Sequence, residues 1–250
     1  MPQIISIHSF RGGTGKSNTA ANLAAMLAKQ GNRVCVIDTD IQSPGIHILF
    51  GLGGEEVQSS LNDFLWHGRA IEEVALDVTP DDVRANSGTI FLVPSSIKPG
   101  EITRVLREGY DARQLTEGLR RLLTGLRLDY LLIDTHPGLN EETLLSLVIS
   151  NTLLIVMRPD QQDYEGTGIT VRVAQELKVP RILLLVNKAP SSLEPTALAQ
   201  QVEKAYGCPV VAVLPHSDEM MELGSRGLFS LTQPSHPIAE QYRGIAAQLA

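Results

Sequence analysis

The stretch SFRGGTGKSN, residues 9–18, decides the fold class of this chain of 250 residues. Three glycines precede a lysine and a serine, directly after the apolar run IISIHSF and before a helical pattern that begins near Lys16. Glycines let the backbone curl until several N–H groups point at one anion, and a helix N-terminus adds partial positive charge. A strand, a glycine-rich turn and a helix in this order are typical of a phosphate-binding loop.

Two residues of the loop carry the predicted chemistry. Lys16 is placed to reach the terminal phosphates of a nucleotide, and the Ser17 hydroxyl to ligate Mg²⁺. The strict eight-residue pattern requires glycine where Phe10 stands, so that pattern fails at one position. A glycine-rich turn that only joins a strand to a helix is the alternative. The flanking strand and helix favour phosphate binding.

The rest of the chain repeats the alternation of strand and helix. Most of its apolar runs are continuous, as in strands that are buried on both faces. We therefore expect a single α/β domain over residues 1–250, with a doubly wound, mostly parallel sheet of about seven or eight strands and helices on both faces. Residues 51–87 are predicted to form small helices outside the sheet. The predicted strands are residues 4–10, 33–38, 89–93, 129–134, 152–157, 181–187 and 209–215.

Composition limits the classes of function. The formal net charge of −7 gives no general attraction to nucleic acid or to anionic lipid. The N-terminus lacks the pattern of a signal peptide, and no apolar run approaches the length of a membrane span. The two cysteines, Cys35 and Cys208, lie in apolar stretches and are expected to be core residues in a reducing compartment. We expect a cytoplasmic protein.

RGGTGKS resembles the deviant Walker A motif of the MinD/ParA family, Lys-Gly-Gly-x-Gly-Lys-Thr/Ser. The resemblance continues through VIDTDIQSPG, YLLIDTHPGLN and LLLVNK. It implies a Mg²⁺-dependent ATP hydrolase whose ATP-bound homodimer encloses two nucleotides, the first lysine of the motif reaching the partner's phosphates. Arg11 stands in place of that lysine and keeps its charge, so we assign it a catalytic role beside Lys16. A solvated loop residue is the alternative. Asn18 replaces the usual threonine, a change predicted to alter contacts to the α-phosphate.

Aspartates follow two of the predicted strands. Asp38 and Asp134 end their strands, and the carboxyl ends of parallel strands face the ligand crevice. With Ser17 they form the predicted Mg²⁺ site, the aspartates acting through metal-bound water. By resemblance, Asp40 orients the attacking water, a task that phosphoryl transfer requires. Each aspartate alone could instead be a helix cap or a turn residue.

The predicted base site lies later in the chain. By resemblance, the Asn187 amide recognises the adenine edge, and the backbone at Pro215 and His216 lies against the same base. An aspartate two places after Asn187-Lys188 would indicate guanine, and this chain has Pro190 there, which favours ATP over GTP. The remaining predicted nucleotide contacts are Gly12, Gly13, Thr14, Gly15, Lys16, Ser17 and Asn18.

Together with the motifs, the resemblance implies an ATP-driven dimerisation switch that positions or regulates an unidentified protein partner. A nucleotide-binding scaffold with little hydrolysis, and a P-loop kinase or ligase acting on a small metabolite, remain alternatives. Membrane binding is not expected, because the C-terminal segment 236–250 carries one basic residue, Arg243. DNA is left open but not favoured. Arg113, Arg120 and Arg127 have the spacing of one helical face, yet acidic residues are interleaved with them.

Overall fold

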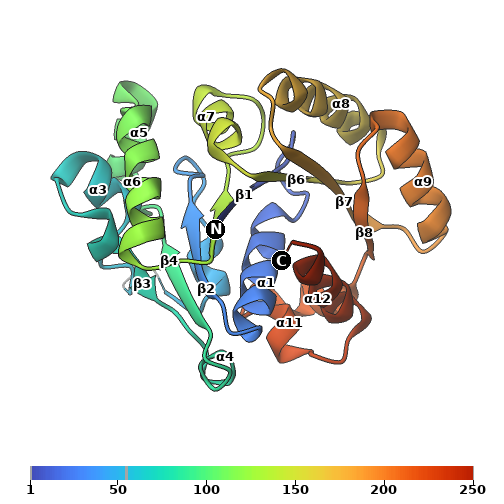
Figure 1. The fold of residues 1–250 in the computed structure, drawn as a ribbon, viewed down its shortest axis with the longest axis horizontal. Coiled ribbons are helices and arrows are strands. Elements are labelled where there is room, and N and C mark those ends of the chain that lie inside the picture. The colour runs from blue at the N-terminus through green and yellow to red at the C-terminus, as the bar shows by residue number, and fades with distance from the viewer. Residues whose placement is uncertain (1, 54–55, 250) are drawn as a thin grey trace.

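The fold is described from a computed structural model, which describes residues 2–53 and 56–249. Within these residues the strands form one eight-stranded sheet in the order β3-β4-β2-β5-β1-β6-β7-β8 (Figure 1). All neighbouring strands are parallel except β3 and β4, which are antiparallel. The predicted fold class is confirmed. The strands are β1 Gln3–His8, β2 Arg33–Asp38, β3 Leu76–Asp77, β4 Thr89–Val93, β5 Tyr130–Asp134, β6 Thr152–Met157, β7 Arg181–Ala189 and β8 Val210–Pro215.

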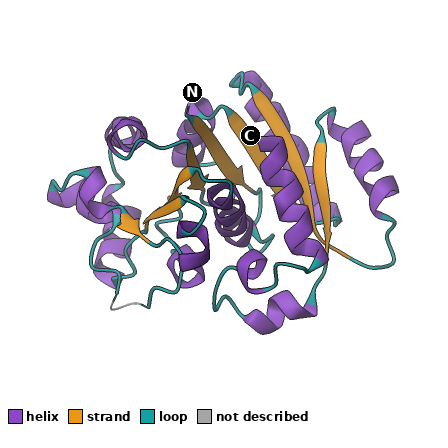
Figure 2. Cartoon of the chain, turned by 60° about the horizontal axis from the view of Figure 1, so that its bottom comes forward, coloured by secondary structure: helices purple, strands orange, loops and turns teal. Residues whose placement is uncertain are grey.

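Helices cover both faces of this sheet, as the views in Figures 1 and 2 show. Within β5, Tyr130 and Leu132 pack into one core with α1, α11 and α12, while Leu131 and Ile133 pack into the opposite core with α3 and α6. A third core lies between β6, β7 and the helices α7, α8 and α9. The helices are α1 Lys16–Lys29, α2 Ile46–Leu49, α3 Leu61–His67, the 3₁₀ helix η1 Ile71–Val74, α4 Asp81–Arg84, α5 Pro99–Glu108, α6 Ala112–Gly125, α7 Glu141–Ile149, α8 Gln161–Glu176, α9 Pro195–Tyr206, α10 Asp218–Leu223, α11 Phe229–Thr232 and α12 Pro237–Leu249.

The topology places the candidate site at the carboxyl edge of the sheet. β1 lies between β5 and β6, so the strand order reverses around β1. Such a reversal opens a crevice at the carboxyl ends of the strands, where ligands of open α/β sheets bind. Asp38 and Asp134 are register partners at the ends of β2 and β5, which brings the two predicted carboxylates side by side.

Two expectations about the fold are corrected. Residues 51–87 do contain small helices, but Leu76 and Asp77 pair with β4 and extend the sheet, so this segment is not wholly outside it. Arg127 lies beyond the end of α6 with a φ of 50°, so it does not continue the helical face of Arg113 and Arg120.

The C-terminal helix α12 packs on α1 and β8, and its residues Tyr242 and Ile245 are fully buried. Among the described residues, no helix has both the length and the apolar character needed to cross a membrane.

Candidate functional site

The loop between β1 and α1 has the backbone that its glycines predict. Gly13 and Gly15 have φ values of 78° and 98°, in the left-handed region that glycine adopts without steric cost. Gly15 is also the N-cap of α1, so the first helical residue is Lys16. The loop borders a cavity of about 270 Å³, which we call the phosphate-loop cavity; it is lined by Ser9, Gly12, Gly13, Gly15, Lys16, Ser17, Asn18, Asp40, Pro137 and Lys188.

Lys16 lies beneath this cavity among carboxylates. Its Nζ donates to Asp134 Oδ1 at 3.0 Å and lies 4.0 Å from Asp40 Oδ2. The side chain is 7% exposed. Burial opposes the charge, but Asp134 and Asp40 outweigh it, so the pKa of Lys16 lies above its ordinary value. A buried ammonium at the N-terminus of a helix is suited to an anionic ligand.

Asp38 is buried beside Asp134 and keeps an unused acceptor. Its Oδ1 accepts from the Asp40 amide at 3.0 Å, whereas the buried Oδ2 has no hydrogen-bond partner. Burial, with Asp134 and Asp40 nearby, raises the pKa of Asp38 well above its ordinary value. An orphaned carboxyl oxygen beside Asp134, at the carboxyl end of β2, fits the water shell of Mg²⁺, which prefers oxygen ligands and retains several waters.

No group of three or more His, Cys, Asp or Glu residues in the described part of the chain is arranged to hold a metal ion on its own. A magnesium ion at this site would therefore rely on the Ser17 hydroxyl, on nucleotide phosphates and on water that the two aspartates accept from.

Asp40 lies at the wall of the phosphate-loop cavity. Its Oδ1 accepts from the Ser43 amide at 3.2 Å and lies 3.8 Å from His136 Nε2. Burial raises the pKa of Asp40, and the neighbouring Lys16 and His136 oppose that rise. The side chain is 13% exposed, so the carboxylate reaches the cavity without being free in solvent.

His8, at the end of β1, was not singled out from the sequence. It is fully buried, and its Nδ1 lies 2.8 Å from Thr135 Oγ1. Burial lowers the pKa of His8 to about 3, with Lys16 and His136 acting in the same direction. The ring is therefore neutral at physiological pH and adds no charge below the phosphate loop. An apolar run that ends in histidine was the only sequence signal for it.

Arg11 is held outside its own phosphate-loop cavity. Its guanidinium bonds to Asp160 at 2.9 Å and to Asp163 at 3.0 Å, and it also donates to Gln162. The hydrogen bond to Asp160 is the main cause of a raised Arg11 pKa. The Arg11 side chain remains 33% exposed. The three partners lie at the start of α8, and the sequence analysis did not identify them.

The predicted base residues line a second cavity of about 300 Å³, the base cavity. Asn187 Nδ2 donates to Thr14 O at 2.8 Å, and Asn187 Oδ1 accepts from the Lys188 amide at 2.9 Å. One N–H and one lone pair of this amide remain available for a base. Asn18 borders both cavities, whereas Thr14, within the loop, is buried and lines neither of them. The base cavity is lined by Gly15, Asn18, Asn187, Lys188, Pro215, His216, Ser217, Met220, Met221, Gly224 and Ser225.

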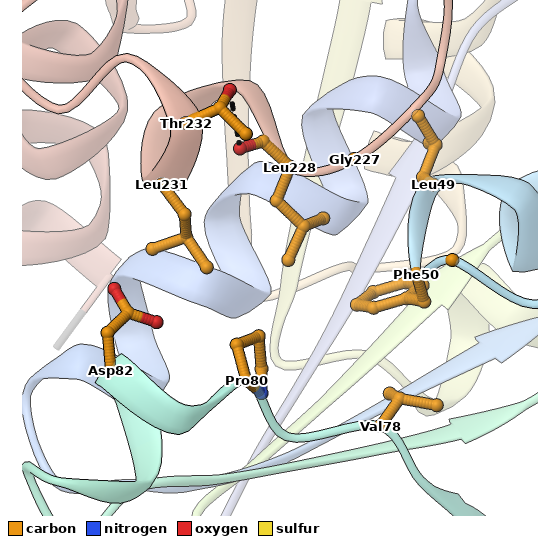
Figure 3. Close-up of a pocket in the computed structure, with 10 residues that line it drawn as sticks. Leu49, Phe50, Val78, Pro80, Asp82, Gly227, Leu228, Leu231 and Thr232 are labelled. Atoms are coloured by element: carbon orange, nitrogen blue, oxygen red, sulfur yellow. Dashed lines mark hydrogen bonds between the residues drawn. The ribbon is translucent and has the colours of Figure 1, made fainter.

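An apolar cavity of about 310 Å³ lies elsewhere, between α2, the β3–α4 connection and α11 (Figure 3). Phe50, Pro80, Leu228 and Leu231 line it. Its carboxylate, Asp82, pairs with Lys29 at 3.1 Å. This cavity shares no lining residue with the other two.

A phosphate loop, strand-end aspartates and a base cavity at a topological switch point define a P-loop nucleotide-binding protein. Residues 2–180 match the family model described as an AAA domain. The chain belongs to this family, the MinD/ParA-type P-loop ATPases, which hydrolyse ATP.

Known proteins resemble the chain over nearly its whole length. An uncharacterised ATP-binding protein of Methanocaldococcus jannaschii is 29% identical over 98% of this chain and 86% of the relative. An iron-sulfur cluster carrier protein of Aquifex aeolicus is 27% identical over 99% of this chain and 67% of the relative. The septum site-determining protein MinD of Pyrococcus horikoshii, solved with Mg-ADP, shares the fold with a TM-score of 0.83 and 21% identity, over 100% of this chain and 96% of that chain.

Proposed function

We propose that residues 1–250 form one ATPase unit that dimerises with Mg²⁺-ATP bound, separates after hydrolysis, and uses this cycle to position or regulate a protein partner. The observation that carries the proposal is the position of Arg11. Its guanidinium lies on α8, outside the cavity of its own subunit, and remains partly exposed. A cation at the start of the phosphate loop that does not line the cavity of its own subunit is suited to the phosphates of a second subunit.

Each remaining residue has a separate task in this proposal. The amides of Gly12, Gly13 and Gly15 surround the phosphates, and Lys16 neutralises their charge. Bound Mg²⁺ would supply charge stabilisation at the transferred phosphoryl group, next to Ser17. Asp40, at the wall of the cavity, orients the attacking water. Asn187 uses its free N–H and lone pair on the adenine edge.

The iron-sulfur carrier relative raises a second activity, and the cysteines of this chain do not favour it. Cluster ligation by protein requires several thiolates that converge on one place. Cys35 and Cys208 are the two cysteines of the chain, and both are buried, on β2 and just before β8. We therefore keep the dimerisation switch, with the low-hydrolysis scaffold as the outcome to be tested against it.

The test measures dimer fraction by light scattering and ATP turnover in parallel, with Mg²⁺-ATP present. Asp40→Ala should retain ATP binding, slow hydrolysis by ~10²- to 10⁴-fold, the range for a positioned general base, and accumulate the dimer. Arg11→Ala, added to Asp40→Ala, should still bind ATP but stay monomeric, and Arg11→Lys should recover part of the dimer.

Arg172→Ala is the matched control, because Arg172 is an exposed arginine on the same helix α8 that Arg11 contacts. It should dimerise like the parent. A full ATP dimer in Arg11→Ala would place Arg11 outside the interface. Parental turnover in Asp40→Ala would contradict the switch, and a parent that binds ATP without turnover even in cell extract would favour the scaffold.

A further inference from the structure

Lys188 connects the two cavities of the nucleotide site, and none of the predicted roles includes it. Its Nζ donates to Gly13 O, in the phosphate loop, at 2.8 Å. Lys188 borders both the phosphate-loop cavity and the base cavity. A nucleotide that occupies both cavities must pass its ribose and α-phosphate between them, and so past the residues that line both, Gly15, Asn18 and Lys188.

The backbone holds Lys188 in this position. Its φ of 56° is in the left-handed region, which a lysine adopts rarely. The conformation falls where the pairing of β7 with β8 shifts in register, between Val186 and Ala189. The Lys188 amide also donates to Asn187 Oδ1, so the strain is offset by a hydrogen bond inside the base site.

Carboxylates outnumber cations around the phosphate loop, so an anionic ligand would need a further positive charge nearby. Asp40 and Asp134 both lie within 4.0 Å of Lys16 Nζ, so two carboxylates share one ammonium. Lys16 is already hydrogen-bonded to Asp134. In the described residues, Lys188 has no carboxylate partner within salt-bridge distance, and its bond to Gly13 O uses only one of its three N–H donors.

We infer that Lys188 binds the α-phosphate of the nucleotide from within the same subunit. Its remaining N–H groups form a charge-assisted hydrogen bond to a phosphate oxygen at the junction with the ribose, while the bond to Gly13 O holds the ammonium over the loop. The inference rests on the proposed function only in taking the ligand to be an adenine nucleotide. Arg11 serves the partner's phosphates, and Lys188 serves those of its own subunit.

The experiment compares adenosine, AMP and ADP in displacing a fluorescent ADP analogue from the whole chain with Mg²⁺ present. Lys188→Met should weaken AMP and ADP by about tenfold or more, the typical effect of losing a hydrogen bond to a charged group, and leave adenosine unchanged. Lys188→Arg should retain most of the AMP affinity, because it keeps the charge.

Lys178→Met is the matched control. Lys178 is also an exposed lysine with a left-handed φ, 57°, but it precedes β7 whereas Lys188 lies near the carboxyl end of that strand. It should bind all three ligands like the parent. Thermal melting of both variants checks that the fold is kept.

Three results would overturn the inference. If Lys188→Met loses affinity equally for adenosine and AMP, the substitution acts on the base site or on the fold and not on the phosphate. A loss for ADP with normal AMP would mean that Lys188 only supports the loop at Gly13. If Lys188→Met binds AMP and ADP as the parent does, Lys188 does not contact the α-phosphate. That result would not affect the proposed ATP-driven dimer. A parent that fails to bind ADP would instead refute the proposed nucleotide site, and this inference with it.

Discussion

Replacing Gly166 with alanine tests how the start of the phosphate loop is supported. Gly166 lies in α8, and a Cβ built on it would be 2.0 Å from Phe10 Cδ1 and 2.2 Å from Phe10 Cγ. Ordinary carbon contacts are about 3.5–4.0 Å apart, so the ring must move by about 1.5 Å. Phe10 directly precedes Arg11, and this movement would shift the guanidinium from Asp160 and Asp163.

The expected magnitude combines two opposing effects. Overpacking costs typically about 1–3 kcal/mol, and exchanging a helical glycine for alanine gains about 0.5–1 kcal/mol. Phe10 is 37% exposed, so its ring has solvent to move into, and the cost should lie near the middle of that range, at about 2 kcal/mol, rather than at its upper end. We expect Gly166→Ala to lower the free energy of unfolding by about 1 kcal/mol.

Urea denaturation without nucleotide measures this difference, and two further glycines serve as controls. Gly168→Ala is the same exchange in the same helix, with its nearest atom, Tyr206 Cε1, at 3.4 Å, and should be near neutral. Gly244→Ala, in α12, meets nothing within 4 Å and should be stabilising. In a Phe10→Ala background, Gly166→Ala should no longer destabilise. If its cost is the same in both backgrounds, contact with the ring is not the cause.

Further predictions concern the nucleotide site. The pKa of Asp38 is higher in the folded protein than in the unfolded chain, where it is about 4. The free energy of unfolding therefore falls as pH rises above about 4, by up to about 1.4 kcal/mol per pH unit, until Asp38 ionises in the folded protein. Asp38→Asn should remove this loss, so the free energy of unfolding of the variant, measured with urea, should rise relative to that of the parent between pH 5 and pH 8. A constant difference between the two proteins over this range would contradict the prediction. Gly15→Ala should abolish ATP binding by calorimetry, because its Cβ would lie 2.3 Å from Asn187 Nδ2 at a φ of 98°, whereas Gly100→Ala, with open space around it, should bind normally. Lys16→Ala should likewise abolish ATP binding, and unchanged affinity would refute the loop assignment.

The strands at the centre of the sheet could be predicted because their local pattern is strong. β2, β4 and β6 begin and end at the predicted residues, since each is a continuous apolar run bounded by polar or turn-forming residues. β3 has two residues, too few for any periodicity, and it exists because β4 offers it a free edge. The end of α6 was missed because Arg127 continues the spacing of the helix but not its backbone.

Some residues of the candidate site could likewise be predicted from local sequence, and others could not. Gly15, Lys16, Asp38 and Asp134 follow from a local motif and from the rule that parallel strands end at one edge. The partners of Arg11 are about 150 residues away in the chain, and Asp160 on its own has the local pattern of a helix cap. Contacts between such distant residues depend on how α8 packs against β6, the neighbour of β1 in the sheet, and no short window of sequence contains that packing.

The hydrogen bonds from Asn187 to Thr14 O and from Lys188 to Gly13 O tie the end of β7 to the phosphate loop, so that the two segments form one rigid unit. If the proposed function holds, this unit would fix the spacing between the base and the first two phosphates, and it would not distinguish ATP from ADP. Asp40 in the same subunit and Arg11 of a second subunit would then have to make that distinction. A site of this kind would still bind ADP after hydrolysis. The rate of ADP release, and not only the rate of hydrolysis, would then limit how soon each subunit can begin its next cycle.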